Sequence, residues 1–200
     1  MGIPAIIATY ATQTAFMGLA LIMCGGMPIS GFSKGFAIIG QGYVGVVPIP
    51  VIIMAICFAI GSFILNKTYF GRYFYAIGGN EKATQLSGID TNKVYFIAYA
   101  NMGLLAGLAG LLCAARVGSV NGSTGTSFEM DAIGSCFIGG ASAYGGSGTV
   151  GGVVIGALLL GVINMGMSIM GIGDSWQYVV KGAVLLIAVV FDVLSNRKNG

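Results

Sequence analysis

Histidine is absent from the 200-residue sequence, and charged residues make up only 8% of it. Without histidine the chain cannot form a Ser-His-Asp triad, a histidine-ligated metal site or a histidine proton relay. Soluble domains carry roughly 25% charged residues, so the low charge content argues against a soluble globular protein. Both absences point away from a water-activating enzyme and toward an integral membrane protein. The net charge of +3 is too small to suggest a nucleic-acid partner.

Cysteine is scarce, and its four positions lie apart from one another in apolar segments: Cys24, Cys57, Cys113 and Cys136. With no short spacing between them, they predict neither a metal site nor a disulfide framework. We interpret them as small buried hydrophobic residues, and we expect this chain to hold no metal and no cofactor of its own.

Hydrophobic residues make up 56% of the chain, and 35 glycines lie among them. A membrane-spanning helix needs about 20 predominantly apolar residues. Five segments reach this length: Ile3–Met23, Val47–Leu65, Val94–Ala115, Val150–Met170 and Trp176–Val193. A sixth segment, Met130–Tyr144, is short and contains Gly134, Gly139 and Gly140, so it is either a tilted span or a broken one.

Lysine and arginine concentrate in two regions: Lys67, Arg72, Lys82 and Lys93 between the second and third spans, and Arg197 and Lys198 near the end. The positive-inside rule places both regions in the cytoplasm, which six crossings satisfy and five do not. The sequence therefore predicts an all-α polytopic transmembrane bundle of about six passes, one of them short or broken, forming a single domain over residues 1–200.

This topology assigns a side to each connection. Both ends of the sequence and the turn near Gly146 are then cytoplasmic, and the loops around Lys34 and Arg116 are outside. Trp176 and Tyr178 form an interfacial aromatic belt at the outer end of the last span.

Two pairs of glycines have the GxxxG spacing of closely packed membrane helices: Gly103 with Gly107, and Gly152 with Gly156. Ala157 and Gly161 extend the second pair at the same spacing. We expect both pairs to serve helix packing.

Two other patterns resemble functional motifs without their context. The stretch GSGTVG at residues 146–151 matches a nucleotide-binding fingerprint, but no βαβ unit surrounds it. The stretch GIGD at residues 171–174 resembles the signature of intramembrane aspartyl proteases, with Asp131 as the second carboxylate. Because Asp174 falls in a short outer turn, we interpret GIGD as a polar turn.

The most polar stretch, GNEKATQLSGI at residues 79–89, predicts a two-turn helix over Glu81–Ser87. Asn80 is a favourable N-cap, Glu81 suits the positive end of the helix dipole, and Gly88 followed by Ile89 is typical of a C-cap. So short a helix is marginal alone in water, so it must pack against something. Either it folds back on its own bundle or it contacts a partner.

Several unusual segments occur in an order that resembles the membrane permeases of ATP-binding-cassette importers for ribose, xylose, galactose and mixed monosaccharides. They are FGRYFYAIGGNEKATQLSGI, AGLAGLLCAAR, FEMDAIGSCFIGGASAYGGSGTVGG, WQYVVKG and a final FD, and they cover nearly all of the chain. Such permeases usually have about ten spans, so the resemblance implies the carboxy-terminal part of one. EMDAIGS here replaces the more usual ELDAIAA, and AARVGSV varies the segment after the arginine.

The resemblance implies a cytoplasmic coupling loop, residues 66–93, whose short helix docks on an ATP-hydrolysing subunit. Carried over by position, this coupling site comprises Gly79, Asn80, Glu81, Ala83, Gly88 and Ile89. It also implies an inner-membrane location in a bacterium, a second permease copy, and a periplasmic or extracellular sugar-binding protein. ATP and Mg²⁺ would be used by the partner subunit.

Other polar residues have two interpretations each. Asn101, Asn164 and Gln177 lie in or at the edges of spans and either line the translocation path or form hydrogen bonds between helices. Arg116, Glu129 and Asp131 either receive the binding protein or form salt bridges within the permease. Lys181 near the outer third of the last span can extend to the interface.

We expect a non-enzymatic permease that moves a monosaccharide by alternating access. The alternative, an ion-coupled carrier or channel, needs an acidic residue deep in a span. The candidate carboxylates instead lie at span ends: Glu129, Asp131, Asp174 and Asp192.

Overall fold

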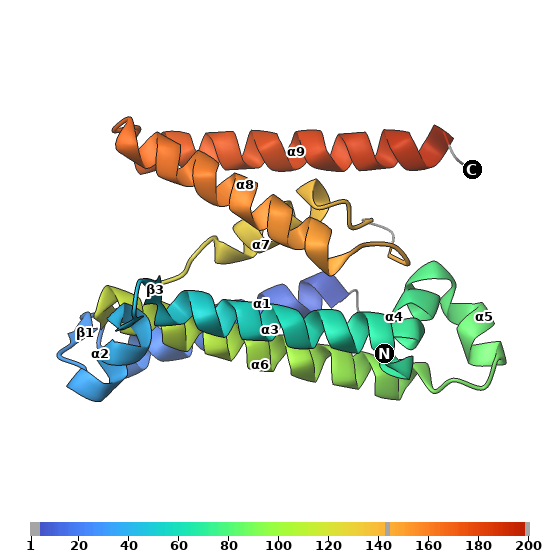
Figure 1. The fold of residues 1–200 in the computed structure, drawn as a ribbon, viewed down its shortest axis with the longest axis horizontal. Helices are drawn as coiled ribbons and strands as arrows, with labels where there is room; N and C mark the ends of the chain where they lie inside the picture. The colour runs from blue at the N-terminus through green and yellow to red at the C-terminus, as the bar shows by residue number, and fades with distance from the viewer. Residues whose placement is uncertain (1–4, 143–144, 199–200) are drawn as a thin grey trace. The chain divides into compact units, whose positions relative to one another are not determined.

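The computed structural model describes residues 5–142 and 145–198 (Figure 1). In chain order its elements are α1 (Ala5–Cys24), β1 (Ile29–Ser30), α2 (Lys34–Gln41), β2 (Tyr43–Val44), β3 (Val47–Pro48), α3 (Ile49–Lys67), α4 (Tyr69–Gly79), α5 (Glu81–Leu86), α6 (Thr91–Val117), β4 (Ser119–Val120), α7 (Phe128–Ile138), α8 (Val150–Ile169) and α9 (Asp174–Lys198). Helices account for nearly all of this regular structure, which confirms the predicted all-α class.

Four helices in the described chain are long and apolar enough to cross a membrane: α1 over Ile7–Cys24, α3, α6 and α8. Each falls within a few residues of a predicted span; the predicted start at Ile3 lies outside the described residues. In α9 the side chains are described only as far as Val190, and the described apolar stretch, Ser175–Val190, is shorter than a full span. The predicted count of six crossings is therefore not confirmed and stays a prediction.

The short segment that the sequence left open, Met130–Tyr144, forms the 11-residue helix α7. At about 1.5 Å per residue such a helix covers roughly 16 Å, about half of the hydrocarbon core. It ends at Ile138, and Gly140 follows in the left-handed region with φ of 81°. The segment is thus broken rather than a tilted full span; Tyr144 lies outside the described residues.

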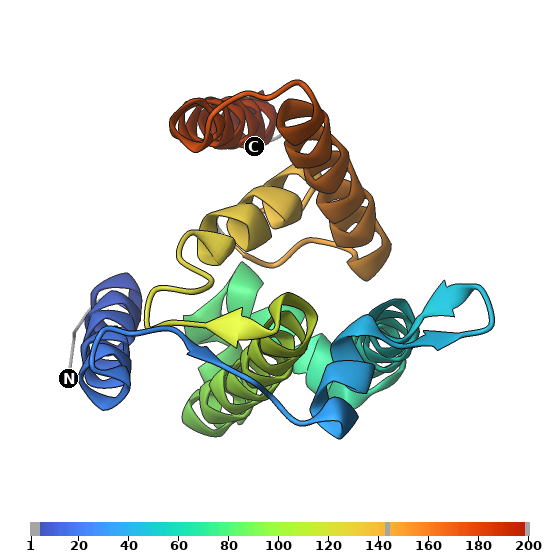
Figure 2. The ribbon, with the colours of Figure 1, turned by 90° about the vertical axis from the view of Figure 1, so that its left-hand side faces the viewer.

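The chain divides into two compact units. The first comprises Met1–Ala55 and Gly103–Thr126, and the second comprises Ile56–Met102 and Ser127–Gly200. In the first unit, β1 pairs antiparallel with β4, Ile29 opposite Val120, and β2 pairs with β3 in a two-residue hairpin (Figure 2). The Gln41 side-chain amide also donates a 3.1 Å hydrogen bond to the carbonyl oxygen of Arg116.

In the second unit, α7 packs against both α8 and α9. α7 and α8 are antiparallel, because Gly139 faces Gly152 while Ser135 faces Gly156. A Cβ atom at Gly156 would overlap the Ser135 carbonyl oxygen, and one at Gly139 would come within 2.5 Å of the Gly152 backbone. Glycine is required at this seam because the two backbones touch. The α7–α8 pair is therefore a tightly packed hairpin.

Candidate functional site

α5 starts where α4 ends, and Asn80 serves both helices. The Asn80 backbone N–H donates to the carbonyl oxygen of Ala76 at 2.9 Å, which closes α4 at Gly79. The Asn80 side-chain oxygen accepts from the Ala83 N–H at 3.0 Å, which caps α5. Glu81 occupies the first turn, where a carboxylate is favourable. Because one residue joins two helices, little slack remains between them.

The carboxy-terminal end of α5 has the hydrogen bonds of a Schellman motif. Gly88 adopts φ of 82°, its N–H donates to the Gln85 carbonyl at 2.9 Å, and the Ile89 N–H donates to the Thr84 carbonyl at 3.4 Å. The predicted short helix with a glycine C-cap is confirmed. It ends at Leu86, with Ser87 as the cap, instead of including Ser87.

One face of α5 packs on its own unit. Thr84 is only 5% exposed, and the Gln85 side-chain amide donates to the Thr91 hydroxyl at 2.9 Å. Ile77 of α4 and Val94 of α6 are also buried. The structure therefore places α5 on the adjoining ends of α4 and α6, as the first of the two interpretations of this helix expected.

The opposite face of α5 is free within the described chain. At about 3.6 residues per turn, Lys82 and Leu86 lie on the side of the helix away from Thr84. Both are exposed, and Leu86 as a whole residue is 90% exposed. Sequence analysis left both residues out of the coupling site. The signal that could have found them is a leucine in a helix whose other residues are mostly polar, on the face opposite Thr84.

Asp90 fixes the turn from α5 into α6. Its carboxylate accepts a 3.3 Å hydrogen bond from the Lys93 N–H and lies 3.2 Å from the Lys93 ammonium. The hydrogen bond from the Lys93 side chain lowers the pKa of Asp90 below its ordinary value, and the bond from the Lys93 backbone adds to this. Asp90 thus holds the start of α6, directly after the end of the α5 segment.

The glycine-rich loop before α8 lies against the end of α4. The Tyr75 hydroxyl donates to the Gly148 carbonyl at 2.8 Å. A Cβ atom at Gly78 would overlap the backbone nitrogen of Gly146, and one at Gly145 would lie 3.0 Å from the Gly78 Cα. Sequence analysis gave this loop no role beyond its predicted cytoplasmic side, because no motif links it to residues some 70 positions earlier.

An ion pair links α7 to α9. The Lys181 ammonium lies 2.8 Å from an Asp131 carboxylate oxygen, with side-chain exposures of 19% and 28%. Asp131 thus forms a salt bridge within the chain, the second of the two interpretations offered for it. Arg116 and Glu129 are exposed and form no ion pair among the described residues, so their role in docking a binding protein stays a prediction.

The three residues considered for the translocation path have different surroundings. Gln177 donates a 3.1 Å hydrogen bond to the Ile172 carbonyl, and Asn101 is exposed. The Asn164 side-chain oxygen is buried and has no hydrogen-bond partner in the described chain. No described contact brings the three residues together, so a shared path for them stays a prediction.

The two glycine pairs also differ. Gly152 and Gly156 form the α7–α8 seam, whereas a Cβ atom at Gly103 or Gly107 would meet nothing within 4 Å. A packing role for Gly103 and Gly107 stays a prediction.

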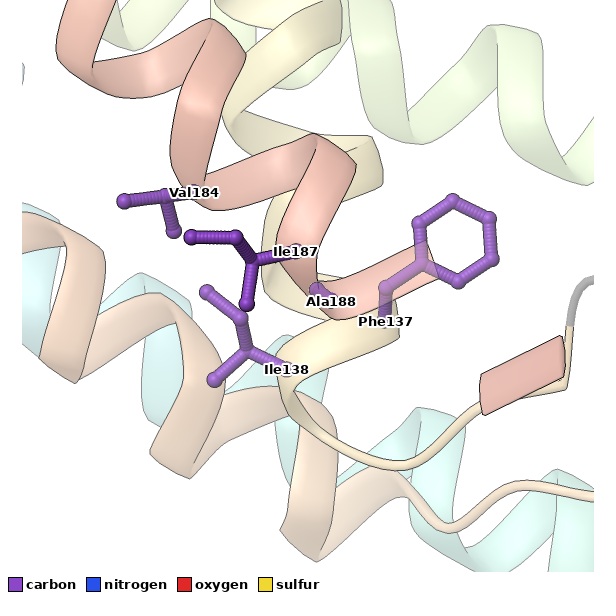
Figure 3. Close-up of a pocket in the computed structure, with 5 residues that line it drawn as sticks. All are labelled: Phe137, Ile138, Val184, Ile187 and Ala188. Atoms are coloured by element: carbon purple, nitrogen blue, oxygen red, sulfur yellow. The ribbon is translucent and has the colours of Figure 1, made fainter. Parts of the chain in front are cut away.

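A pocket of about 340 Å³ lies between α7 and α9 (Figure 3). The described residues that line it are all apolar: Phe137, Ile138, Val184, Ile187 and Ala188. Sugar hydroxyls would lose their hydrogen bonds in such surroundings, so this pocket does not suit a sugar.

Metal and disulfide chemistry have no geometric basis in the described part of the chain. The four cysteines are free and half-buried, and no three histidine, cysteine or acidic residues with described side chains lie close enough to hold a metal ion. The Asp174 and Asp192 side chains lie outside the description.

The family model and curated relatives that match this chain are described as transport permeases. The family model described as "Branched-chain amino acid transport system / permease component" matches residues 1–189. The ribose import permease protein of Haemophilus influenzae is 44% identical over 194 residues, which are 95% of this chain and 60% of that protein. That of Bacillus subtilis is 45% identical over 188 residues, covering 93% of this chain and 58% of that protein.

The xylose transport system permease protein of Escherichia coli is 42% identical over 153 residues, which are 76% of this chain and 39% of that protein. The chain thus spans less than two thirds of the length of these curated relatives. No solved structure matches it.

Proposed function

The chain belongs to the family of branched-chain amino acid transport system permease components, and from this premise we propose that it is part of the membrane subunit of an ATP-driven sugar importer. The cargo is a monosaccharide, because the relatives that match it over most of its length carry ribose and xylose in their names. The chain is a multi-pass membrane protein, and we place it in the bacterial inner membrane.

The importer works with three further components: an ATPase subunit, a sugar-binding protein and a second copy of the permease. The ATPase binds ATP and Mg²⁺, and this chain holds no cofactor and performs no catalysis. The charged segment from Lys67 to Lys93 faces the cytoplasm, where an ATPase is found. The loops around Arg116 and Glu129 face the binding protein.

The observation that carries this proposal is the construction of α5. Its inner face is fixed by Thr84 and Gln85, its ends are capped by Asn80 and Gly88, and its outer face offers an exposed leucine. A rigid element with a free apolar residue at a charged membrane face suits a docking contact, because exposed apolar groups gain stability when a partner covers them. We assign the Leu86 and Lys82 face of α5 to the ATPase.

The test is Leu86→Asp in the full-length permease, expressed with its ATPase subunit. We expect normal membrane insertion, since Leu86 has no packing role, and a loss of ATPase co-purification of roughly tenfold or more because a carboxylate replaces a desolvated anchor. Asn92→Ala, also exposed and on the first turn of α6, is the matched control and should co-purify normally. Unchanged co-purification for Leu86→Asp would contradict the assignment of this face.

A further inference from the structure

The contact between α4 and the glycine-rich loop lies one residue away from the start of α5. Gly78 and Gly79 are the last residues of α4, and Asn80 then caps α5. In the loop, Gly145 and Gly146 have φ of 87° and 77°, and each would place a Cβ atom 3.0 Å from the backbone of Gly78 or Gly79. The two chain segments therefore touch backbone to backbone, with no side chain between them.

A hydrogen bond strengthens the same contact. Tyr75 lies one turn before Gly79 on α4, is half-buried, and its hydroxyl donates to the Gly148 carbonyl at 2.8 Å. Contact at two points, the glycine backbones and the tyrosine hydroxyl, prevents the loop from pivoting about either one. Within the second unit, α4 and the loop are thus held as one body.

The loop is in turn fixed to the α7–α8 hairpin. Its turn is closed by the Ser142 N–H, which donates to the Ser147 carbonyl at 3.1 Å. Thr149 follows and caps α8, accepting from the Gly152 N–H at 3.1 Å. Gly152 is itself part of the seam with Gly139, which directly follows α7. An unbroken series of close contacts therefore runs from Asn80 to the hairpin.

We propose that Tyr75 and Gly78, with Gly145, Gly146 and Gly148, form a latch that transmits displacement of α5 to the α7–α8 hairpin. This inference rests on the proposed function, since it assumes that an ATPase moves α5. A rigid-body push is transmitted only where the intervening contacts have no slack, and contacts between backbones provide this. Tyr75 and Gly78 act as positioning residues, because they touch neither the sugar nor the ATPase.

The experiment measures coupling separately from docking. The full-length permease is reconstituted in proteoliposomes with its ATPase and binding protein, and three quantities are followed: bound ATPase, basal ATP hydrolysis and sugar-stimulated ATP hydrolysis. Gly78→Ala places a Cβ atom in the Gly146 backbone, and Tyr75→Phe removes only the hydroxyl. The matched controls are Gly151→Ala, where a Cβ atom meets nothing within 4 Å, and Tyr73→Phe, whose hydroxyl bonds to nothing in the described chain.

The latch predicts that both variants keep their bound ATPase and basal hydrolysis while stimulated hydrolysis falls. We expect a fall of roughly tenfold or more for Gly78→Ala, since the backbones must separate. For Tyr75→Phe we expect roughly twofold to tenfold, the usual effect of losing one hydrogen bond. The two control variants should behave as the unmodified permease does.

Two results overturn the latch. Stimulated hydrolysis that is unchanged in both variants would show that no displacement passes through this contact. A parallel loss of membrane level and of all three quantities in Tyr75→Phe would show a merely structural bond. If Gly78→Ala fails to assemble, Tyr75→Phe alone decides. Failure of the proposed function differs from both results, because the unmodified permease would then show no sugar-stimulated hydrolysis at all.

Discussion

Asp131 and Lys181 are the pair of charged side chains that join two helices of the second unit. Both are mostly covered by protein, and their 2.8 Å separation is short enough for a strong hydrogen bond. Removing one partner leaves a partly desolvated charge unpaired, which costs more than losing an exposed ion pair. Neutralising both partners removes that penalty.

A double-mutant cycle tests this pair. Asp131→Asn and Lys181→Gln should each lower the free energy of unfolding by about 1 to 3 kcal/mol, a range between exposed and buried pairs. The double variant should lose less than the sum of the two. The measurement is thermal unfolding of the detergent-solubilised full-length permease. Additive losses would show that the two side chains do not interact in the membrane.

For single residues, the sequence was informative where one residue type strongly favours one local backbone geometry. Asn80 and Gly88 were predictable because an N-cap and a left-handed C-cap position favour those residues strongly. Tyr75 and the partner of Asp131 were not predictable, because their roles depend on which helices pack together. The sequence allowed both interpretations of Asp131, and only the packing of α7 on α9 decided between them.

The α7–α8 hairpin is the element with the tightest packing in the described chain's second unit. Its seam consists of Ser135 on α7, Gly139 directly after α7, and Gly152 and Gly156 on α8. Small residues at this spacing let two membrane helices approach until their backbones touch. The hairpin should therefore tolerate no added atoms at the seam, while the outer face of α8 should tolerate them.

Gly156→Ala and Gly161→Ala make the same chemical change on α8. At Gly156 the new methyl group would overlap the Ser135 carbonyl, so we expect a loss of about 1 to 3 kcal/mol in unfolding free energy. At Gly161 it meets nothing within 4 Å, so the preference of helices for alanine should leave stability unchanged or slightly higher. Equal effects of the two substitutions on detergent unfolding would argue against the seam.

The helices that could be predicted from the sequence are mainly those that contain a long hydrophobic run. The long apolar segments gave α1, α3, α6, α8 and α9, since length and hydrophobicity determine a span. The four two-residue strands were missed because elements so short leave no periodic pattern. The helices α2 and α4 were also missed, although both are amphipathic, because neither contains an apolar run of membrane-spanning length. In the segment around α7 the sequence contains three glycines, but composition alone does not determine whether they bend a helix or end it.

Across the whole molecule, the account requires one orientation in the membrane. The positive-inside rule places α5 in the cytoplasm and the turn around Ser123 outside. Thr84 is an obvious position for a cysteine label from the sequence, but it is only 5% exposed, so protection there would say nothing about sidedness. Lys82 and Ser123 are both exposed and therefore suitable.

Cysteine labelling in intact cells checks this orientation. With all native cysteines of the full-length permease replaced by alanine, Ser123→Cys should react with a membrane-impermeant thiol reagent and Lys82→Cys should not. Permeabilised cells that express the permease without its ATPase subunit provide the control, since both positions should then react. Labelling of Lys82→Cys in intact cells, with Ser123→Cys protected, would contradict the orientation and with it the contact between α5 and a cytoplasmic ATPase.

The central claim is that α5 couples this permease to ATP hydrolysis, and Gly88 offers the most direct test. Proline cannot adopt the φ of 82° found at Gly88, whereas asparagine tolerates the left-handed region. A Cβ atom at Gly88 meets nothing within 4 Å, so both substitutions act through the backbone alone. They therefore form a matched pair.

The measurement is sugar uptake together with sugar-stimulated ATP hydrolysis by the reconstituted full-length transporter. The account predicts that Gly88→Pro reaches the membrane and assembles normally but loses both activities, while Gly88→Asn retains most of both. Full uptake and full stimulated hydrolysis with Gly88→Pro would contradict the account, leaving α5 as a loop helix that only packs on its own bundle.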